Sequence, residues 1–343
     1  MSFIKIYPDT SVCAWHLNNL NFSYTKTDLD HCDLAVFHFP YPYVGQEKTQ
    51  FEIRIDLALK TNKKVIVLIS ELHDETLEFC LNFLNPNIRY FTCGLINNVP
   101  TTPWMDWFIT STELYQKTNI LDELEPFKVK EKSFDILLGQ PKPHRSYIHD
   151  YINNNHLNDQ VIMTYMDWKG SPILKMSDKE WIWESDIEEL SEDTRWTVSL
   201  VKYRGHEIRL SQIVPISVYN KTAYSLIAET NTNNQYSFYT EKTVKPILGQ
   251  RLFLTLSGQY FLRNLRNLGF KTFDGIIDEG YDAIEDSNLR YQLVCQQLEY
   301  LIDQPQQIIL NQIKPIVEHN KNLMLNYDWH KEFQKEFKQA LIL

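Results

Sequence analysis

The stretch CDLAVFHFP (Cys32–Pro40) is a nearly continuous apolar run that ends at a proline. Such a run is typical of a strand that is buried on both faces, as in a parallel sheet. The segment KKVIVLISE (Lys63–Glu71) repeats this pattern. Between the two, Glu47–Lys63 carries apolar residues at helical spacing, so the three segments together predict a β-α-β unit.

The same alternation of strand and helix continues in both directions. FIKIYP predicts a strand before this unit, and a helix over Asp74–Asn85 and a strand over Ile88–Gly94 follow it. Asn97–Lys132, with its prolines and charges, is interpreted as the connection between domains. A second series then predicts strands in FDILLG, QVIMTYMD, KTAYSLIAET, RLFLTLSG and FKTFDGII. Helices are predicted between these strands, and the region 288–343 reads as helical.

The chain has 343 residues, whereas one domain typically has about 150. The pattern therefore predicts two α/β domains with parallel sheets and a cleft between them. The first domain is expected over 1–125 and the second over 126–320, with a C-terminal helix over 321–343 that packs back on the first. Ligands of such sheets bind beyond the carboxyl ends of the strands.

The formal net charge of -10, from 44 acidic and 34 basic residues, disfavours coating of nucleic acid through a global basic field. A local basic groove stays open as an alternative, and its candidates are Lys48, Arg54, Lys63 and Lys64. Five cysteines without a CxxC pattern predict reduced thiols in a cytoplasmic protein and no zinc site. No signal peptide or transmembrane segment is predicted.

A second stretch, SFYTEKTVKPILGQ (Ser237–Gln250), suggests chemistry. Thr240 is a good helix cap and Glu241 suits the first turn, so an ordinary capped helix is one interpretation. Lys242, however, is unfavourable at a helix N-terminus unless an anion binds there, and helix N-termini do bind phosphate. With Glu241 accepting hydrogen bonds from a ribose diol and Tyr239 covering a ring, the stretch predicts a pocket for a sugar nucleotide.

The wider segment SLIAETNTNNQYSFYTEKTVKPILGQRLFLTLSG (Ser225–Gly258) resembles the donor-binding region of α1,3-fucosyltransferase-like glycosyltransferases. The residues that carry the resemblance are Glu229, Tyr239, Thr240, Glu241 and Lys242. The sequence departs from the family pattern at Glu229-Thr230, where an acidic-Asn pair is usual, and at Lys245-Pro246. These departures leave both the sugar and the base of the donor, GDP or UDP, open.

The resemblance implies a GT-B architecture, in which two Rossmann-like domains face a central cleft. It implies a donor on the C-terminal domain, an acceptor mostly on the N-terminal domain, and no obligatory metal or other cofactor. Lys242 would pair with the diphosphate and Glu241 with the ribose, while Glu229 and Tyr239 would lie near the donor. The family also holds phosphate with an arginine after the first strand of the second domain, and His144 and Arg145 in QPKPHR occupy that place.

A transfer that inverts the sugar configuration needs a general base, which is expected on loops of the first domain. FHFPYPYVGQEK offers His38 and Glu47 as catalytic candidates, and PWMDWF offers Asp106. Each has a structural explanation as well, because lone histidines on strands are usually core residues. Tyr41 and Tyr43 are candidates for stacking on a sugar or a base. A retaining enzyme would not need this base, and that alternative stays open.

Two further regions have weaker signals. Asp278 and Glu279 lie in an acidic loop that lacks the ligand spacing of an EF-hand, and they are expected near the donor. Four tryptophans either pin an irregular loop to the core or form a sugar-stacking lid: Trp168, Trp181, Trp183 and Trp196.

The sequence thus predicts a metal-independent, inverting glycosyltransferase that uses a nucleotide sugar. The acceptor is predicted to be a glycan, a lipid-linked sugar or a hydroxylated base in DNA. Two alternatives stay open: a non-catalytic protein that binds nucleotide sugars or glycans on the same scaffold, and a sugar-nucleotide epimerase.

Overall fold

The computed structural model describes residues 4–18, 23–39, 45–139, 141–165, 187–189 and 200–342. The two tyrosines and four tryptophans considered for stacking lie outside these ranges: Tyr41, Tyr43, Trp168, Trp181, Trp183 and Trp196.

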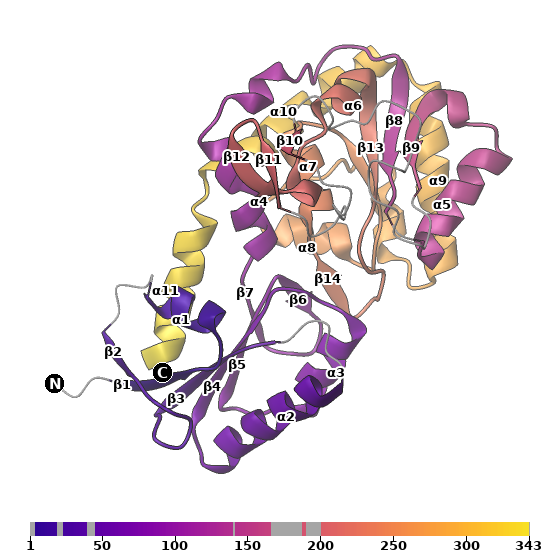
Figure 1. Cartoon of the computed structure of the whole chain (residues 1–343). Helices are drawn as coiled ribbons and strands as arrows, with labels where there is room; N and C mark the ends of the chain where they lie inside the picture. The colour runs from indigo at the N-terminus through magenta and orange to yellow at the C-terminus, as the bar shows by residue number, and fades with distance from the viewer. Residues whose placement is uncertain are drawn as a thin grey trace. The chain divides into compact units, whose positions relative to one another are not determined.

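The chain divides into two compact units (Figure 1). The first comprises Met1–Asp106, Gln235–Phe238 and Asp328–Leu343, and the second comprises Trp107–Asn234 and Tyr239–Tyr327. Residues 107–125 therefore group with the second unit, whereas the sequence placed the boundary at 125. Each unit contains a parallel sheet with helices, so the predicted α/β class with two Rossmann-like units is confirmed.

The first unit is built on a six-stranded sheet in the order β2-β1-β3-β4-β5-β7, with every neighbouring pair parallel. Its strands are β1 (Ile4–Pro8), β2 (Tyr24–Lys26), β3 (Leu34–His38), β4 (Lys64–Ile69), β5 (Ile88–Thr92) and β7 (Thr101–Pro103). The two central strands, β3 and β4, are the apolar runs that the sequence predicts. Strand β7 lies inside the segment interpreted as an interdomain connection, so part of that segment belongs to the first sheet.

Helices cover both faces of this sheet (Figure 1). They are α1 (Ser11–Asn18), α2 (Gly45–Lys60), α3 (Asp74–Asn82) and α11 (Trp329–Ile342). On one face, Phe51 of α2 and Phe79 of α3 pack against Phe39. On the other face, Phe333 and Phe337 of α11 contact Phe91 of β5.

A short antiparallel pair completes the first unit. Strand β6 (Gly94–Ile96) pairs with β14 (Tyr236–Phe238), which the chain supplies after passing through the second unit. Gly94 permits this pairing, because a Cβ there would lie 2.0 Å from the carbonyl oxygen of Ser237.

The second unit contains a four-stranded parallel sheet in the order β15-β13-β8-β9. Its strands are β8 (Lys132–Leu137), β9 (Val161–Thr164), β13 (Thr222–Ala228) and β15 (Phe253–Leu256). Helix α5 (Pro143–Asn154) joins β8 to β9, and α7 (Glu241–Leu248) lies between β13 and β15. Because these crossovers run in opposite directions along the sheet, the right-handed rule places the two helices on opposite faces.

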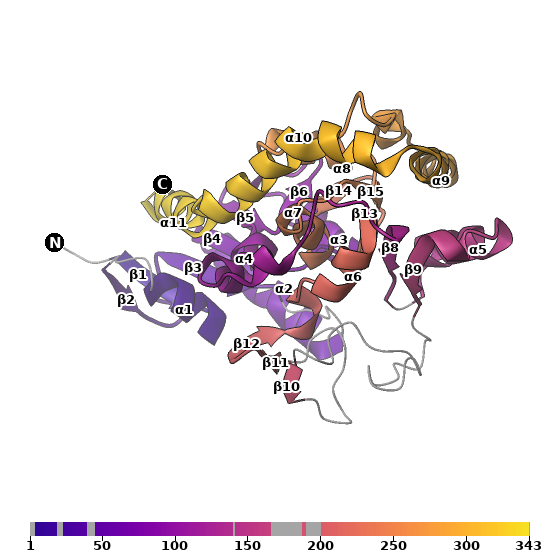
Figure 2. The same cartoon turned by 90° about the horizontal axis from the view of Figure 1, so that it is seen from above.

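The remaining elements of the second unit surround this sheet, and α9 packs beside α5 (Figure 2). The helices are α4 (Asp106–Gln116), α6 (Ile216–Lys221), α8 (Phe261–Asn267), α9 (Ser287–Asp303) and α10 (Gln306–Asn326). The short 3₁₀ helices are η1 (Ile120–Glu123), η2 (Asn158–Gln160), η4 (Leu210–Gln212) and η5 (Glu279–Ala283). The predicted strand in FKTFDGII is wrong, since the structure has only a single bridge there, between Asp274 and Ile277.

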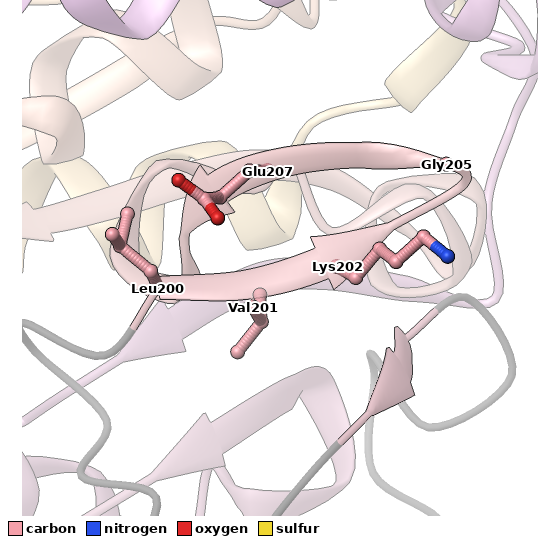
Figure 3. A pocket seen from close by; sticks show the side chains of 5 residues that line it. All are labelled: Leu200, Val201, Lys202, Gly205 and Glu207. Carbon is pink, nitrogen blue, oxygen red and sulfur yellow. The ribbon is translucent and has the colours of Figure 1, made fainter.

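A small antiparallel sheet, β10-β11-β12, also belongs to the second unit. Its strands are β10 (Ile187–Glu189), β11 (Leu200–Tyr203) and β12 (His206–Arg209). The turn residues Arg204 and Gly205 have φ values of 50° and 81°, as a two-residue hairpin turn requires. A pocket of about 340 Å³ lies on this hairpin (Figure 3), and none of the sequence-predicted site residues lines it.

Two further observations concern the chain as a whole. All five cysteines are buried and free of disulfides. Among the described helices, none is both long enough and apolar enough to cross a membrane.

Candidate functional sites at two switch points

In both parallel sheets the strand order reverses at one place. The reversal lies between β1 and β3 in the first sheet and between β8 and β13 in the second. Ligands of open α/β sheets bind at the carboxyl ends of the strands at such switch points. His38 ends β3, Arg145 lies in the first turn of α5 after β8, and Glu229 directly follows β13. These three predicted residues thus lie at two switch points, one in each unit.

The carboxylate of Glu229 is the centre of the second site. It is 1% exposed, and its Oε2 accepts hydrogen bonds from Thr240 Oγ1 at 2.8 Å and from the Thr230 backbone N–H at 3.1 Å. Its Oε1 accepts from Thr243 Oγ1 at 2.5 Å and from the Thr240 backbone N–H at 3.4 Å. Glu229 therefore ties the end of β13 to the first turn of α7.

Thr240 is the N-cap of α7, as the sequence predicts. Its backbone is extended, and its hydroxyl accepts from the Lys242 backbone N–H at 3.3 Å. The adjacent Glu241 and Lys242 form an ion pair, with Lys242 Nζ 2.8 Å from Glu241 Oε1. Burial opposes ionisation of Glu241, but the cations of Lys242 and Lys245 hold its pKa below the ordinary value. Glu241 and Lys242, which are adjacent in the sequence, are thus in direct contact at the N-terminus of α7.

His144 and Arg145 lie in the first turn of α5 and both bind the backbone carbonyl of Glu229. The distances are 2.7 Å from His144 Nε2 and 3.4 Å from Arg145 Nη2. Since a carbonyl oxygen only accepts, His144 carries its proton on Nε2. Burial, together with the charge of Arg145, lowers the pKa of His144 to about 3, so the ring is neutral at pH 7. Arg145 is itself 3% exposed.

A third cation, which sequence reasoning missed, joins this site. Lys142 is the N-cap residue of α5, and its Nζ donates to the Thr230 carbonyl at 2.5 Å. Lys242 Nζ donates to the Thr230 hydroxyl at 3.2 Å. Lys142, Arg145 and Lys242 therefore converge on the dipeptide Glu229-Thr230. The available signal was the position of Lys142 beside His144 and Arg145 in the same turn.

Lys245, which the sequence showed only as a departure from the family pattern, is also buried at this helix. Its Nζ donates to the Ser211 carbonyl at 3.0 Å. Burial lowers its pKa to about 8, although Glu241 counteracts this effect. Lys245 thus adds a further positive charge behind Glu241.

Other residues expected near the donor lie in the core or in separate networks. Tyr239 is fully buried, and its hydroxyl donates to the Phe261 carbonyl at 3.0 Å. Glu279 is buried and accepts from Thr272 Oγ1 at 2.6 Å and from Arg266 at 2.8 Å. Asp278 caps η5 by accepting from the Gly280 backbone N–H. Their contacts stabilise the loops of the second unit, and a role at the donor stays a prediction.

The first unit has a pocket of about 480 Å³ at its own switch point. It is lined by Asp9, Thr10, His38, Gln46, Glu47, Gln50, Phe51 and Arg54. The pocket therefore brings together His38 and Glu47, both predicted as catalytic candidates. Glu47 is exposed in the first turn of α2. Burial lowers the pKa of His38, whose Nε2 lies 3.4 Å from Ser70 Oγ. Asp106, the third candidate, begins α4.

Metal binding was also predicted to be absent. Within the described ranges, no three His, Cys, Asp or Glu side chains gather in a way that would hold a metal ion. Metal independence of the reaction stays a prediction.

The two sheets with their switch-point sites define an α/β protein of two Rossmann-like units. No family model matches the chain, and no curated protein matches it. Among solved structures, one described as "Crystal Structure of alpha1,3-Fucosyltransferase" is similar over 95% of this chain and 90% of that chain. The identity is 12% and the TM-score is 0.40. A likeness at this level defines neither a substrate nor a reaction.

Proposed function

We propose that this protein is a glycosyltransferase of the GT-B type that moves a sugar from a nucleoside diphosphate donor to an acceptor hydroxyl. The donor is GDP- or UDP-linked, the transfer inverts the anomeric configuration, and no metal is required. The acceptor is a glycan or a hydroxylated DNA base. One observation supports the proposal most: three cationic side chains and two helix N-termini gather at the switch point of the second sheet.

This arrangement suits a departing diphosphate. Helix N-termini present free backbone N–H groups and a positive dipole end to an anion, and preorganised cations stabilise charge that develops on a leaving group. The Lys242 side chain is 22% exposed and is therefore the cation offered for direct contact. Arg145 is buried behind the Glu229 carbonyl, so it adds positive potential from the interior.

Glu241 and the first-unit candidates complete the proposed chemistry. When Lys242 turns to the diphosphate, the Glu241 carboxylate becomes an acceptor for the ribose hydroxyls. In the transfer, the acceptor hydroxyl oxygen attacks the anomeric carbon, the bond from that carbon to the diphosphate breaks, and the hydroxyl proton passes to a base. Glu47 is the accessible carboxylate for this role, and His38 is the second candidate.

Nucleoside diphosphate binding tests the donor site. We expect Lys242→Ala to weaken binding of GDP or UDP by about 1.5–3 kcal/mol, the scale of hydrogen bonds to charged groups. Arg145→Ala should weaken binding less, because Arg145 is buried and contributes its charge from the interior. Titration calorimetry measures this effect. Lys221→Ala, at an exposed position in the same unit, serves as the matched control and should bind like the parent. Arg145→Lys tests whether the fork of the guanidinium is needed.

Unchanged affinity in both alanine variants, with the fold intact by circular dichroism, would remove the phosphate assignment. Turnover then separates the alternatives. Tight nucleotide binding without transfer to any acceptor indicates a binding protein. Release of an altered sugar nucleotide without an acceptor indicates an epimerase.

A further inference from the structure

The pocket of the first unit contains an ion pair that the proposed chemistry does not use. Asp9 follows β1 and Arg54 lies on α2, with Arg54 Nη2 at 3.1 Å from Asp9 Oδ1 and 3.3 Å from Oδ2. The Tyr7 hydroxyl donates to Asp9 Oδ1 at 3.2 Å. The Asp9 side chain is 3% exposed, whereas that of Arg54 is 40% exposed. The carboxylate is therefore held from two sides within the lining of the pocket.

Arg54 and Asp9 can both form further hydrogen bonds. In the described part of the chain, Arg54 Nε is buried and has no hydrogen-bond partner. An unsatisfied buried donor costs free energy unless a ligand or water supplies an acceptor. A carboxylate can also accept more bonds than the contacts described here provide. Asp9 and Arg54 thus offer a donor and an acceptor side by side.

The other lining groups point to a neutral, hydroxyl-rich ligand. Gln46, Gln50 and Thr10 each supply donors as well as acceptors, and Phe51 supplies an apolar ring. Two carboxylates face one guanidinium in the pocket, and burial keeps His38 neutral at pH 7. This negative balance disfavours a phosphodiester backbone. The volume of about 480 Å³ lies in the ordinary range for small-molecule sites.

We propose that this pocket binds one neutral saccharide ring, with Asp9 accepting from one ring hydroxyl and Arg54 donating to its neighbour. The inference rests on the proposed function for its meaning, since the bound ring is then the acceptor. It favours a glycan over a hydroxylated DNA base as the acceptor class. Asp9 and Arg54 are positioning residues in this account, and Glu47 remains the proposed base.

Saturation-transfer NMR on the full chain, without donor, tests the pocket. The probes are the methyl glycosides of galactose, glucose, mannose and N-acetylglucosamine. We expect at least one to bind, and Asp9→Asn to weaken that binding about tenfold or more, since one hydrogen bond to a charged group is lost. Gln50 also lines the pocket but is exposed, so Gln50→Ala leaves the core of the protein intact. This variant should weaken glycoside binding less than Asp9→Asn does. Asp56→Asn on the same helix, paired to Lys60 and outside the pocket lining, is the control and should bind normally.

Binding of none of the four glycosides, or parent-like binding by both Asp9→Asn and Gln50→Ala, would overturn the inference. Displacement of the bound glycoside by a short DNA duplex containing 5-hydroxymethylcytosine would also overturn it. GDP and UDP affinities of the same variants separate the two proposals, since Asp9→Asn should leave them unchanged. If the protein binds a glycoside but neither GDP nor UDP, the saccharide pocket is supported and the transferase proposal is rejected. If it binds GDP or UDP but no glycoside, the transferase proposal is supported and the saccharide pocket is rejected.

Discussion

At the scale of single residues, Glu229 organises the second site. Its carboxylate accepts hydrogen bonds from two threonine hydroxyls and two backbone N–H groups, and its own carbonyl accepts from His144 and Arg145. One side chain and its backbone thus connect β13, α5 and α7. Because a buried carboxylate is costly unless fully hydrogen-bonded, this position requires glutamate.

Glu229→Gln tests that requirement. The amide keeps the shape but replaces one acceptor oxygen with a donor that faces other donors, so we expect a loss of about 2–4 kcal/mol in the free energy of unfolding. Chemical denaturation followed by circular dichroism measures it. Glu285→Gln, at an exposed position, should have almost no effect. A parent-like stability of Glu229→Gln would contradict the requirement for a glutamate at this position.

The sequence predicted this site better than the other one. Glu229, Thr240 and Lys242 lie close together along the chain, and a cap signal marks where they meet. Asp9 and Arg54, in contrast, are 45 residues apart and meet only when β1 and α2 come together. No local pattern encodes such a pair. Tyr239 is buried against Phe261 and Phe108, a contact that the local sequence did not indicate, and its role near the donor stays a prediction.

At the scale of elements, the sequence predicted best those strands that are buried on both faces. β3, β4 and β13 are mostly apolar, so their composition indicates that they are buried. The edge strand β2 is short and polar, and no expectation covered it. FKTFDGII was wrongly predicted because Phe270, Phe273 and Ile277 are buried without forming a strand. Gly275, at a φ of 85°, turns the chain within this segment.

The terminal helix α11 supplies core to the first unit, which gives an element-scale prediction. Phe333 is 2% exposed and contacts Phe91, Trp104 and His16. We expect Phe333→Ala to destabilise this unit by about 3–5 kcal/mol, the cost of a large cavity. Hydrogen exchange read by mass spectrometry should show faster exchange in β5 and α11. Phe333→Leu, which keeps most of the volume, should show a smaller change, and equal exchange in all three proteins would contradict the packing.

At the scale of the whole molecule, two buried histidines make stability depend on pH. Burial lowers the pKa of His16 to about 4 and that of His144 to about 3, whereas histidine in an unfolded chain has a pKa of about 6.5. Below pH 6.5 the unfolded chain therefore takes up protons that the folded protein does not. Their stabilising contribution is complete above about pH 6.5 and is lost as the pH falls towards 4.

Between pH 7 and pH 5, each histidine should lower the free energy of unfolding by about 2 kcal/mol, since one pKa unit corresponds to about 1.36 kcal/mol. Denaturant unfolding at pH 7 and pH 5 measures this loss, and His16→Phe and His144→Gln should each reduce it. His206→Gln, at an exposed position, should not. Burial raises the pKa of Asp9, Asp135, Glu279 and Asp282, which opposes the loss, so the comparison of variants carries the test. An unaltered pH dependence in both variants would contradict the neutral state of these rings.

The chain crosses between its units after residues 106, 234, 238 and 327. During synthesis, the first hundred residues leave the ribosome without the strand that pairs with β6 and without the helix that covers Phe91. Most domains complete their fold as their own stretch of chain emerges. Here the first unit stays incomplete, with an unpaired edge at β6 and an uncovered Phe91, until α11 has been translated. Most of the first unit is thus synthesised early but completes its fold late. The nascent chain is most vulnerable to aggregation between these two events.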